Sequence, residues 1–485
     1  MIDFSHLENY RENNRIEAKK ALGGLPGSIW ETYSAFANTL GGIILLGVVE
    51  KADKTFDTVN LPDPQGLIAE FWNIINNPQK VSVNILSDKN VYVQEVDGDH
   101  IIVIDIPRAD RAYRPVYIDG NPISGTYRRN GEGDYRCTKE EYQAMVRDAT
   151  AVTQDALVLE EMQLDVLNGE SIRSYRQRMR LSRPGHVWEA LEDEDFLLRI
   201  GAAAIGKDGR KHPTSAGLLM FGNEYEIVRE FPSYFLDYQE RYDETTRWTD
   251  RIISSSGDWS GNIYDFYFRV YNKLVQDIKV PFKLEGVTRI EDTPVHHALR
   301  EALANCLVNA DYYGRQGIVI IKQRDSITLS NPGRFRIEID AARSGGISDP
   351  RNSMLLKMFN LIDIGERAGS GIPNIFSVWN GQGWKEPVIS ENFEPDRITL
   401  SLNLKKIGDK KSAIKIGDKK SAIKTMRKEL IVEYLTDNAE AKAAQIAEYV
   451  HLQPSRVRDY LKELVDEDIV VAEGARKNRI YRLKA

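Results

Sequence analysis

The sequence is poor in cysteine, since its 485 residues include only Cys137 and Cys306. Two distant thiols cannot build a disulfide framework or a four-ligand zinc site, and they fit a reducing, cytoplasmic compartment. Long apolar runs are also missing: the longest covers residues 41–49, whereas a membrane-spanning helix needs about 20 apolar residues. The first 20 residues have no apolar core and no small-residue cleavage site. We therefore expect no membrane partner and no secretory signal.

The chain also lacks an excess of basic residues. It has 65 lysines and arginines against 72 acidic residues, a net charge of −7, so any prediction of nucleic-acid binding must depend on local patches. No GxxxxGK[ST] phosphate loop occurs, which excludes a motor helicase of the P-loop kind. Hydrophobic residues make up 42% and charged residues 28%, which is ordinary for a folded protein. At roughly 150 residues per domain, the length predicts about three domains.

Patterns along the chain predict an α+β multidomain protein. Residues 1–150 combine a helix at 28–40 with strands at 41–50, 80–87, 90–96 and 100–107, and a turn at Asp97-Gly98 joins the last two strands. The regions that follow are a connecting α/β domain at 151–285, a helix, strand and glycine-loop domain at 286–404, a lysine-rich linker at 405–424 and a small helical domain at 425–485. The linker repeats IGDKKSAIK twice in tandem, which is typical of a solvated spacer.

The last region has the spacing of a winged helix-turn-helix. An apolar helix face at 443–450 precedes a short turn and Pro454, and proline is favoured at the first position of a helix. The helix that Pro454 opens would present Arg456 and Arg458 to a DNA groove. The hairpin after it carries Arg476 and Lys477, which suit phosphate contacts. A winged helix that binds protein is the alternative, because acidic and basic residues balance in this region.

The most specific set of residues lies in 286–404. Glu301 and Asn305 are four positions apart and therefore share one helix face. A carboxylate there can polarise a water, and an amide oxygen one turn away can hold a hydrated Mg²⁺ between phosphates. Asn331-Pro332-Gly333 makes a tight turn after a strand, and the backbone amides of GERAGSGI at 365–372 can cradle phosphates. We predict that the helix faces a pocket walled by both glycine turns.

This order of motifs resembles the ATP-binding fold shared by gyrase-type, Hsp90-type, histidine-kinase and MutL-type (GHKL) proteins. It resembles more closely the divergent version named after the RecG C-terminal region. The resemblance implies a GHKL-like α/β sandwich that binds ATP and Mg²⁺, with Glu301 as ATPase base and Asn305 as magnesium ligand. The other implied nucleotide contacts are Asn331, Gly333, Gly346, Gly369 and Gly371. Further matches to the family pattern are Arg300, Asp311, Tyr312, Ser348, Asp349, Arg351, Asn352, Glu366 and Arg367.

Two positions depart from that pattern. Asn331 stands where the family usually has the aspartate that reads the adenine amino group, and its amide oxygen can still accept that bond. The second glycine of the same box is replaced near Phe335. Nucleotide binding is therefore expected, and the sequence leaves hydrolysis open.

Residues 10–130 resemble the Schlafen/AlbA-type domain. The match consists of Glu12, Glu17, Lys19 and the segments 34–39, 41–42 and 46–48. In Schlafen nucleases, paired glutamates and a following aspartate bind a divalent metal, Mg²⁺ or Mn²⁺, for phosphodiester cleavage. The resemblance implies Glu12 and Glu17 as such acids, with Glu50 nearest to the third position and Asp53 next. The alternative is binding without cleavage, in which Glu17 pairs with a basic residue.

The same region ends in arginines interleaved with tyrosines. Arg128 and Arg129 are the candidates for backbone contacts to nucleic acid, and solvated hairpin charges are the alternative. Together the resemblances imply a transcriptional regulator that binds DNA or RNA and in which ATP changes nucleic-acid binding. A homodimer is expected by analogy. A metal-dependent nuclease of tRNA, other RNA or DNA in phage defence is the competing class, and a scaffold that binds neither ligand is the third.

Overall fold

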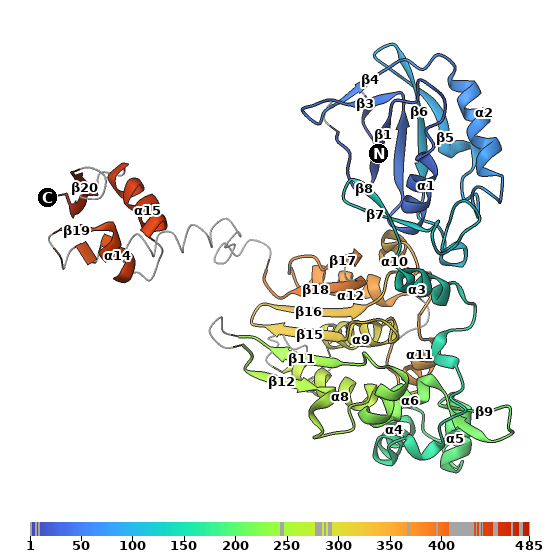
Figure 1. Cartoon of the computed structure of the whole chain (residues 1–485). Helices are drawn as coiled ribbons and strands as arrows, with labels where there is room; N and C mark the ends of the chain where they lie inside the picture. The colour runs from blue at the N-terminus through green and yellow to red at the C-terminus, as the bar shows by residue number, and fades with distance from the viewer. Residues whose placement is uncertain are drawn as a thin grey trace. The chain divides into compact units, whose positions relative to one another are not determined.

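The structure is a computed structural model. It describes residues 2–4, 7, 10–242, 247–276, 284–285, 288–289, 293–365, 369–393, 396–406, 431–432, 434–435, 438, 440–449, 454–466, 469–474 and 479–484. The chain divides into two compact units, Met1–Ile407 and Gly408–Ala485. Helices and strands are mixed in both (Figure 1). In the part of the chain that the structure describes, no helix has the length and apolar character to span a membrane.

The first unit begins with a four-stranded sheet in the order β1-β2-β6-β5. Its strands are β1 (Ile16–Lys19), β2 (Gly42–Leu46), β5 (Val91–Val96) and β6 (Asp99–Ile106). Alternate residues enter two cores, because successive side chains of a strand point to opposite faces. Ile44 and Ile104 pack with helices α1 (Ile29–Asn38) and α2 (Pro64–Ile75). Leu45 and Val103 pack in the core that includes Phe56.

Strand pairing departs from the sequence prediction at two places in this region. The predicted strand at 41–50 divides at Gly47 into β2 and β3 (Val48–Glu50), which belong to different sheets. The turn at Asp97-Gly98 joins β5 to β6, with φ positive at both residues. The predicted strand at 80–87 is absent from the described sheets, and this segment forms only an isolated bridge between Val81 and Ile118. The Tyr33 hydroxyl group instead pairs with the backbone of this segment, since it donates to Val83 O and accepts from Ile85 N.

Short elements complete the N-terminal region. They are β3 (Val48–Glu50), β4 (Phe56–Thr58), β7 (Tyr127–Asn130), β8 (Gly133–Arg136) and α3 (Lys139–Ala149). Thr138 caps α3 through a reciprocal capping box with Glu141, which satisfies amides that the first helical turn leaves open. The cap fixes the first residue of α3. Because the helix is regular, it also fixes the position of Asp148 in the last turn.

A six-stranded mixed sheet is the centre of the remaining part of the first unit. Its strands lie in the order β12-β11-β15-β16-β18-β17. Its strands are β11 (Leu236–Glu240), β12 (Asp250–Ile253), β15 (Ile318–Gln323), β16 (Ser326–Pro332), β17 (Val388–Phe393) and β18 (Asp396–Asn403). The predicted boundary between residues 285 and 286 falls inside this unit, because β11 pairs in parallel with β15. One hydrophobic core also runs from Leu159 to Leu402.

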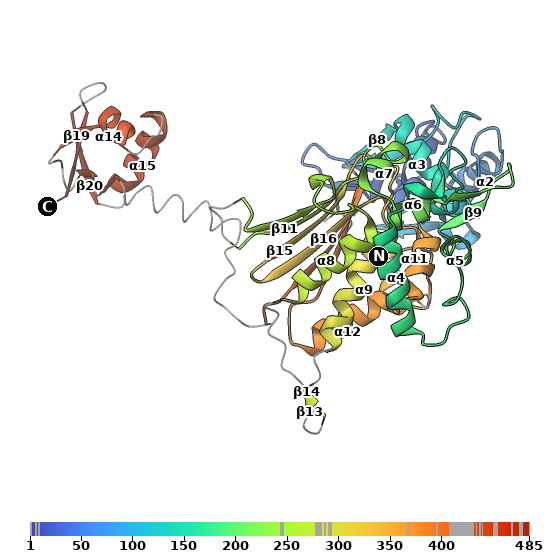
Figure 2. The same cartoon turned by 90° about the horizontal axis from the view of Figure 1, so that it is seen from below.

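Helices α8, α9 and α12 lie on one face of this sheet (Figure 2). The helices of this part are α4 (Gly169–Ser182), α5 (Asp193–Ile200), α6 (Ser215–Phe221), α7 (Glu224–Glu230), α8 (Ile263–Val275), α9 (Pro294–Val308), α10 (Ile339–Ser344), α11 (Ser353–Asn360) and α12 (Gly371–Gly381). Two short hairpins pair β9 (Ala203–Ile205) with β10 (Lys211–Pro213), and β13 (Leu284–Glu285) with β14 (Thr288–Arg289). Helix α9 begins with Pro294 after Thr293, the start that proline favours.

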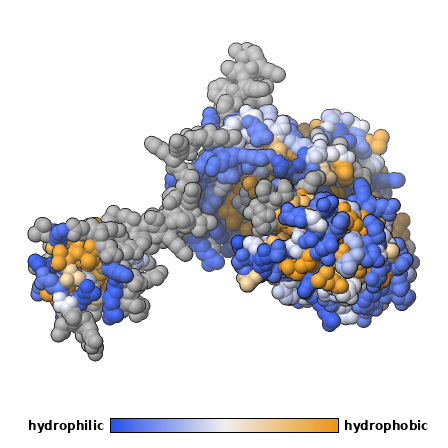
Figure 3. All heavy atoms as spheres, turned by 90° about the horizontal axis from the view of Figure 1, so that it is seen from above, coloured by the Kyte–Doolittle hydropathy of each residue, from blue (hydrophilic) through white to orange (hydrophobic). Residues whose placement is uncertain are grey.

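Charged and polar residues dominate the surface around smaller hydrophobic areas on the face drawn in Figure 3. The second unit holds β19 (Ala441–Lys442), α14 (Ala443–Tyr449), α15 (Pro454–Asp466), β20 (Val470–Glu473) and β21 (Ile480–Leu483). Ile446, Leu461 and Tyr481 share its core. Of the predicted first helix of this region, residues 431–432 and 434–435 are described, and they are helical.

Candidate functional site

The helix α9 and both predicted glycine turns line one cavity of about 1120 Å³, its open mouth included. Glu301 and Asn305 come from α9, Asn331 from the end of β16, and Gly369 and Gly371 from the turn into α12. Because α9 packs against both α12 and β16, residues that are distant in the sequence meet at this point. Gly333 and Gly346, which are also predicted to contact nucleotide, are not among the described residues that line the cavity. The predicted nucleotide contacts stay predictions.

Glu301 and Asn305 are directly bonded. The Asn305 side-chain nitrogen donates to Glu301 Oε1 at 3.0 Å, which leaves the Asn305 oxygen as the atom available to a cation. Glu301 is 8% exposed. A Cβ on Gly371 would lie 2.0 Å from Glu301 Oε1, so only glycine permits this approach of α12 to the carboxylate. Because its nitrogen is hydrogen-bonded to Glu301, Asn305 presents its side-chain oxygen, and amide oxygens are ligands that Mg²⁺ prefers.

Asn331 is oriented by its own backbone surroundings. Its side-chain nitrogen donates to Pro332 O at 3.2 Å and to Asn309 O at 3.4 Å. The nitrogen is thereby committed, and the oxygen is the group left to accept from a ligand amino group. Apolar side chains, among them Leu329 and Ile375, line the same cavity, as expected where a flat heterocycle packs.

The loop of residues 345–352 forms another wall of the cavity. Asn352 is buried and donates to Val308 O and Ala310 O, both at 2.8 Å, which ties the loop to the end of α9. Gly346 is exposed with φ +83° and lies beside the cavity-lining residues Ile347 and Ser348. Glu366 and Arg367 of the predicted pattern lie outside the described residues.

Cys306 also lines the cavity, one residue after Asn305. Burial raises the pKa of its thiol to about 12, so the thiolate is scarcely populated near neutral pH. Because the thiolate is the nucleophilic form of cysteine, Cys306 serves packing here and not covalent chemistry.

Arg108 and Arg111 belong to the arginine and tyrosine segment that the sequence favoured for nucleic-acid contacts, but in the structure they join the N-terminal region to this cavity. Arg108 donates to both carboxylate oxygens of Glu391, at 2.7 and 2.9 Å, and to Phe335 O at 2.9 Å. The Arg108 and Glu391 side chains are only 3% and 1% exposed. Glu391 also accepts from Phe335 N at 2.9 Å. The position where the family pattern has its second glycine is thus held by a buried ion pair between Arg108 of the N-terminal region and Glu391 of β17.

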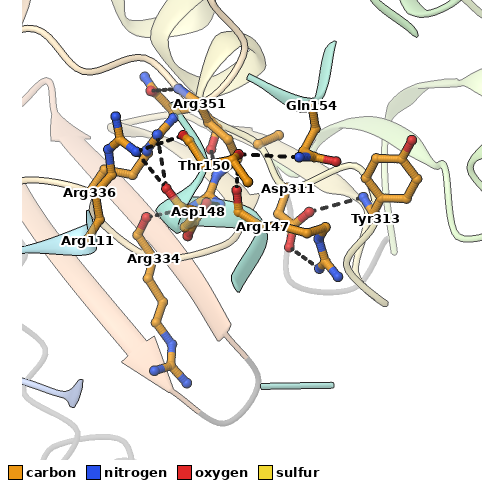
Figure 4. Close-up of polar contacts among 12 residues, drawn as sticks. Arg111, Arg147, Asp148, Thr150, Gln154, Asp311, Tyr313, Arg334, Arg336 and Arg351 are labelled. Carbon is orange, nitrogen blue, oxygen red and sulfur yellow. Dashed lines mark hydrogen bonds and ion pairs between the residues drawn. The ribbon is translucent and has the colours of Figure 1, made fainter. Parts of the chain in front are cut away.

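A second set of contacts lies beside this pair, and we call it the interface cluster: Arg111, Asp148, Arg336, Asp349 and Arg351. Figure 4 shows Arg111, Asp148, Arg336 and Arg351 of this cluster. Arg336, Asp349 and Arg351 line the cavity. Arg111 follows β6, and Asp148 is near the end of α3. The family pattern had flagged Asp349 and Arg351 only as motif matches, and no local signal indicates their partners, 238 and 203 residues away.

The three acids predicted from the Schlafen resemblance lie near one another. Burial raises the pKa of Glu12, and the charges of Glu17 and Glu50 raise it further. Glu17, however, pairs with Lys19 at 2.9 Å and with Arg129 at 2.8 Å. Among the described residues, no group of three histidine, cysteine or acidic side chains is arranged to hold a metal. As placed, these acids do not fit a metal centre.

The two arginines predicted to contact nucleic acid instead form ion pairs within the protein. The Arg129 side chain is 1% exposed and pairs with Glu17 and Asp134, and Arg128 pairs with Glu141 at 3.0 Å. The expectation of exposed charges at this hairpin is therefore wrong for Arg129. The competing role for Glu17, pairing with a basic residue, is what the structure shows. An isolated sequence motif could not separate these outcomes, because the partners come from different strands.

The winged-helix candidates are only partly described. Arg458 is exposed on α15, and Arg456 lies on the same helix. Arg476 and Lys477 lie outside the described residues. Their predicted role at the hairpin tip stays a prediction.

Four family models match the chain. The model "Schlafen, AlbA_2" matches residues 12–138, and "Putative ATP-dependent DNA helicase recG C-terminal" matches 316–400. "Winged helix-turn-helix DNA-binding" matches 427–471, and "Domain of unknown function (DUF8451)" matches 143–237. The chain thus carries a Schlafen AlbA_2 domain, a RecG C-terminal-like domain and a winged helix, in that order. The RecG C-terminal-like match begins after α9, so the packing of α9, and not the match, places Glu301 and Asn305 at the cavity.

Two solved structures resemble the chain. The DIP2311 protein from Corynebacterium diphtheriae is 15% identical, with 97% of this chain and 95% of that chain covered and a TM-score of 0.40. The N-terminal domain of a RecG-related protein from Nitrosomonas europaea is 30% identical, with 28% of this chain and 95% of that chain covered and a TM-score of 0.23. No curated protein matches the sequence.

Proposed function

We propose that the protein is a nucleic-acid-binding regulator whose RecG C-terminal-like part binds Mg-ATP, and that nucleotide occupancy changes its affinity for nucleic acid. The observation that carries the proposal is the cavity in which α9 meets the two glycine turns. The winged helix and the Schlafen AlbA_2 domain are the parts proposed to contact DNA or RNA.

Each predicted residue has a chemical role in this proposal. The Asn331 oxygen accepts from the base amino group, and the Asn305 oxygen holds the cation that neutralises the phosphates. The first turn of α12, which starts at Gly371, offers backbone amides and the positive end of the helix dipole to phosphate. Glu301 is the candidate base for ATP hydrolysis, one helical turn from Asn305.

Binding to labelled duplex DNA and to tRNA, with and without Mg-ATP, tests the proposal. Fluorescence anisotropy of the full chain is expected to show an affinity that changes about five-fold or more with nucleotide, within the usual range of allosteric coupling. Asn305→Ala is expected to abolish the change. Asn380→Ala, an exposed asparagine on α12, is the matched control and is expected to keep it. An identical affinity with and without nucleotide in the unmodified protein would contradict the proposal.

A metal-dependent nuclease is the second candidate, favoured by the three crowded carboxylates of the N-terminal region. Glu50 Oε1 is buried and accepts no hydrogen bond from any described residue, whereas Glu50 Oε2 pairs with Lys54 at 3.3 Å. The ion pairs of Glu17 count against it. Incubation of labelled tRNA and DNA with Mn²⁺, beside Glu12→Ala/Glu17→Ala, separates the two, since only a nuclease loses cleavage in the variant. The homodimer stays a prediction that sedimentation velocity would test.

A further inference from the structure

The loop after β6 reaches from the N-terminal sheet to the wall of the cavity. The strand β6 ends at Ile106, and Arg111, five residues later, pairs through its Nε with Asp349 Oδ2. Arg111 Nη1 also donates to Asp148 O at 2.7 Å and to Thr150 O at 3.0 Å. One arginine of the N-terminal region thus joins the cavity loop at 345–352 to the end of α3. Figure 4 shows Arg111 beside Asp148 and Thr150.

Asp148 makes the second connection. Its carboxylate pairs with Arg351, and Arg351 in turn donates to Arg334 O at 2.8 Å and to Asn309 O at 3.2 Å. These two carbonyls belong to the glycine turn after Asn331 and to the end of α9. Burial raises the pKa of Asp148, but Arg351 and Arg336 outweigh that effect and the net pKa is lowered. The carboxylate is therefore charged at neutral pH, as the pairing requires.

Charge and burial make the interface cluster sensitive to a ligand. It contains three arginines and two aspartates, a net charge of +1, and its side chains are between 6% and 25% exposed. Arg336 donates to Pro350 O at 2.9 Å and to Asp148 O at 3.3 Å, while its Nε lies 3.5 Å from Asp349. Because the low dielectric of a buried site strengthens such interactions, an anionic ligand in the adjoining cavity changes the balance between Asp349 and its two arginines.

We propose that Arg111 and Asp148 are positioning residues of the cavity loop. Through their contacts, the effect of nucleotide binding is transmitted to the N-terminal Schlafen AlbA_2 domain. The inference rests on the proposed function and names the contacts through which the regulation acts. A nucleotide that shifts Asp349 or Arg351 changes the contacts of Arg111 and Asp148. A ligand can bias an equilibrium only through such differential contacts. Neither Arg111 nor Asp148 is among the described residues that line the cavity.

The test compares the coupling factor, the ratio of nucleic-acid dissociation constants with and without Mg-ATP, in the full chain and its variants. Arg111→Gln and Asp148→Asn are expected to bind Mg-ATP within about three-fold of the unmodified protein by calorimetry. Their coupling factors are expected to fall to near 1, whereas each variant still binds nucleic acid. By reciprocity, nucleic acid then no longer changes their nucleotide affinity either.

Lys80→Gln is the matched control, because it removes a charge of the same region from an outlying pair with Asp119. It is expected to keep the coupling factor of the unmodified protein. Unchanged coupling in Arg111→Gln and Asp148→Asn overturns the inference and leaves the proposed function standing. Loss of nucleotide binding in these variants also overturns it, because the residues would then belong to the binding site itself. Absence of nucleotide binding in the unmodified protein is a different result, and it refutes the proposed function.

Hydrogen exchange of the unmodified chain gives a readout that does not depend on how the variants fold. Addition of Mg-ATP is expected to slow amide exchange in residues 108–114 and 139–150, besides the cavity loops. Protection confined to 301–309, 331–336 and 345–352 would overturn the inference, because nucleotide binding would then stop at the cavity.

Discussion

Removal of the Arg108 side chain tests how firmly the N-terminal region is fixed to the cavity. In Arg108→Ala, Glu391 loses both of its charged hydrogen bonds and retains only the amide of Phe335. Its side chain is 1% exposed, so water does not replace the lost partner. The variant leaves the buried Glu391 charge without a hydrogen-bonded cationic partner, and Arg114 acts on it only through its charge.

The structure sets the size of this effect. Breaking a buried ion pair by removal of one partner costs about 3–5 kcal/mol, because the remaining charge stays desolvated. Arg108→Met/Glu391→Leu removes both charges, leaves the Phe335 amide without its acceptor and leaves the Phe335 carbonyl without its donor, at about 1–3 kcal/mol for each group. Arg108→Ala also removes the donor to that carbonyl and in addition keeps the buried charge. The double variant is therefore expected to be more stable than Arg108→Ala alone.

Scanning calorimetry of the full chain measures the difference. The unfolding entropy is about 2.1 cal/mol/K per residue, so in a unit as long as Met1–Ile407 a change of about 1 kcal/mol shifts the Tm by about 1 °C. The transition of the first unit is therefore expected to fall by about 4–6 °C in Arg108→Ala. Lys80→Ala, from a pair whose side chains are 33% and 60% exposed, is expected to cost at most about 1 kcal/mol. Equal small shifts in Arg108→Ala and Lys80→Ala, or a double variant less stable than Arg108→Ala, would refute the reasoning.

Three further predictions follow from individual contacts. Gly371→Ala places a methyl group against Glu301 and is expected to weaken Mg-ATP binding at least ten-fold by calorimetry; unchanged affinity would contradict the close approach. Glu12 has a folded-state pKa raised by burial and by Glu17, so its ionisation opposes folding as pH rises through that pKa. Glu12→Gln is thus expected to raise the Tm at pH 7, with the gain lost below the unfolded pKa, whereas Glu17→Gln breaks ion pairs and lowers the Tm; a destabilised Glu12→Gln would contradict this. Arg458→Ala is expected to weaken DNA binding at all sequences and to reduce the salt slope by about 1, and an unaltered slope would exclude a phosphate contact.

The elements that meet at the cavity could be predicted from the sequence because their motifs are local. Glu301 and Asn305 share a helix face by spacing alone, and glycine at 369 and 371 indicates a turn where side chains have no room. The helix spacing of the winged helix and the alternation of 100–107 are local signals of the same kind. Each of these predictions needed only neighbours within one element.

The remaining features depend on contacts that no local pattern encodes. Arg108 and Glu391 are 283 residues apart, and an arginine that follows a strand gives no sign of burial. Arg129 was expected on the surface because its charge suits phosphate, yet Glu17 and Asp134 hold it inside. The shared sheet was missed for the same reason, since β11 pairs with β15 although β12, α8, the β13–β14 hairpin and α9 lie between them in the sequence. Such pairings follow from tertiary packing and not from propensity.

Calorimetric titration of the full chain with a non-hydrolysable ATP analogue and Mg²⁺ tests the central claim most directly. The account predicts saturable 1:1 binding that requires Mg²⁺ and that Asn305→Ala and Asn331→Ala each weaken at least ten-fold. Absence of binding heat in the unmodified protein, together with no rise in its Tm at millimolar nucleotide, would contradict it.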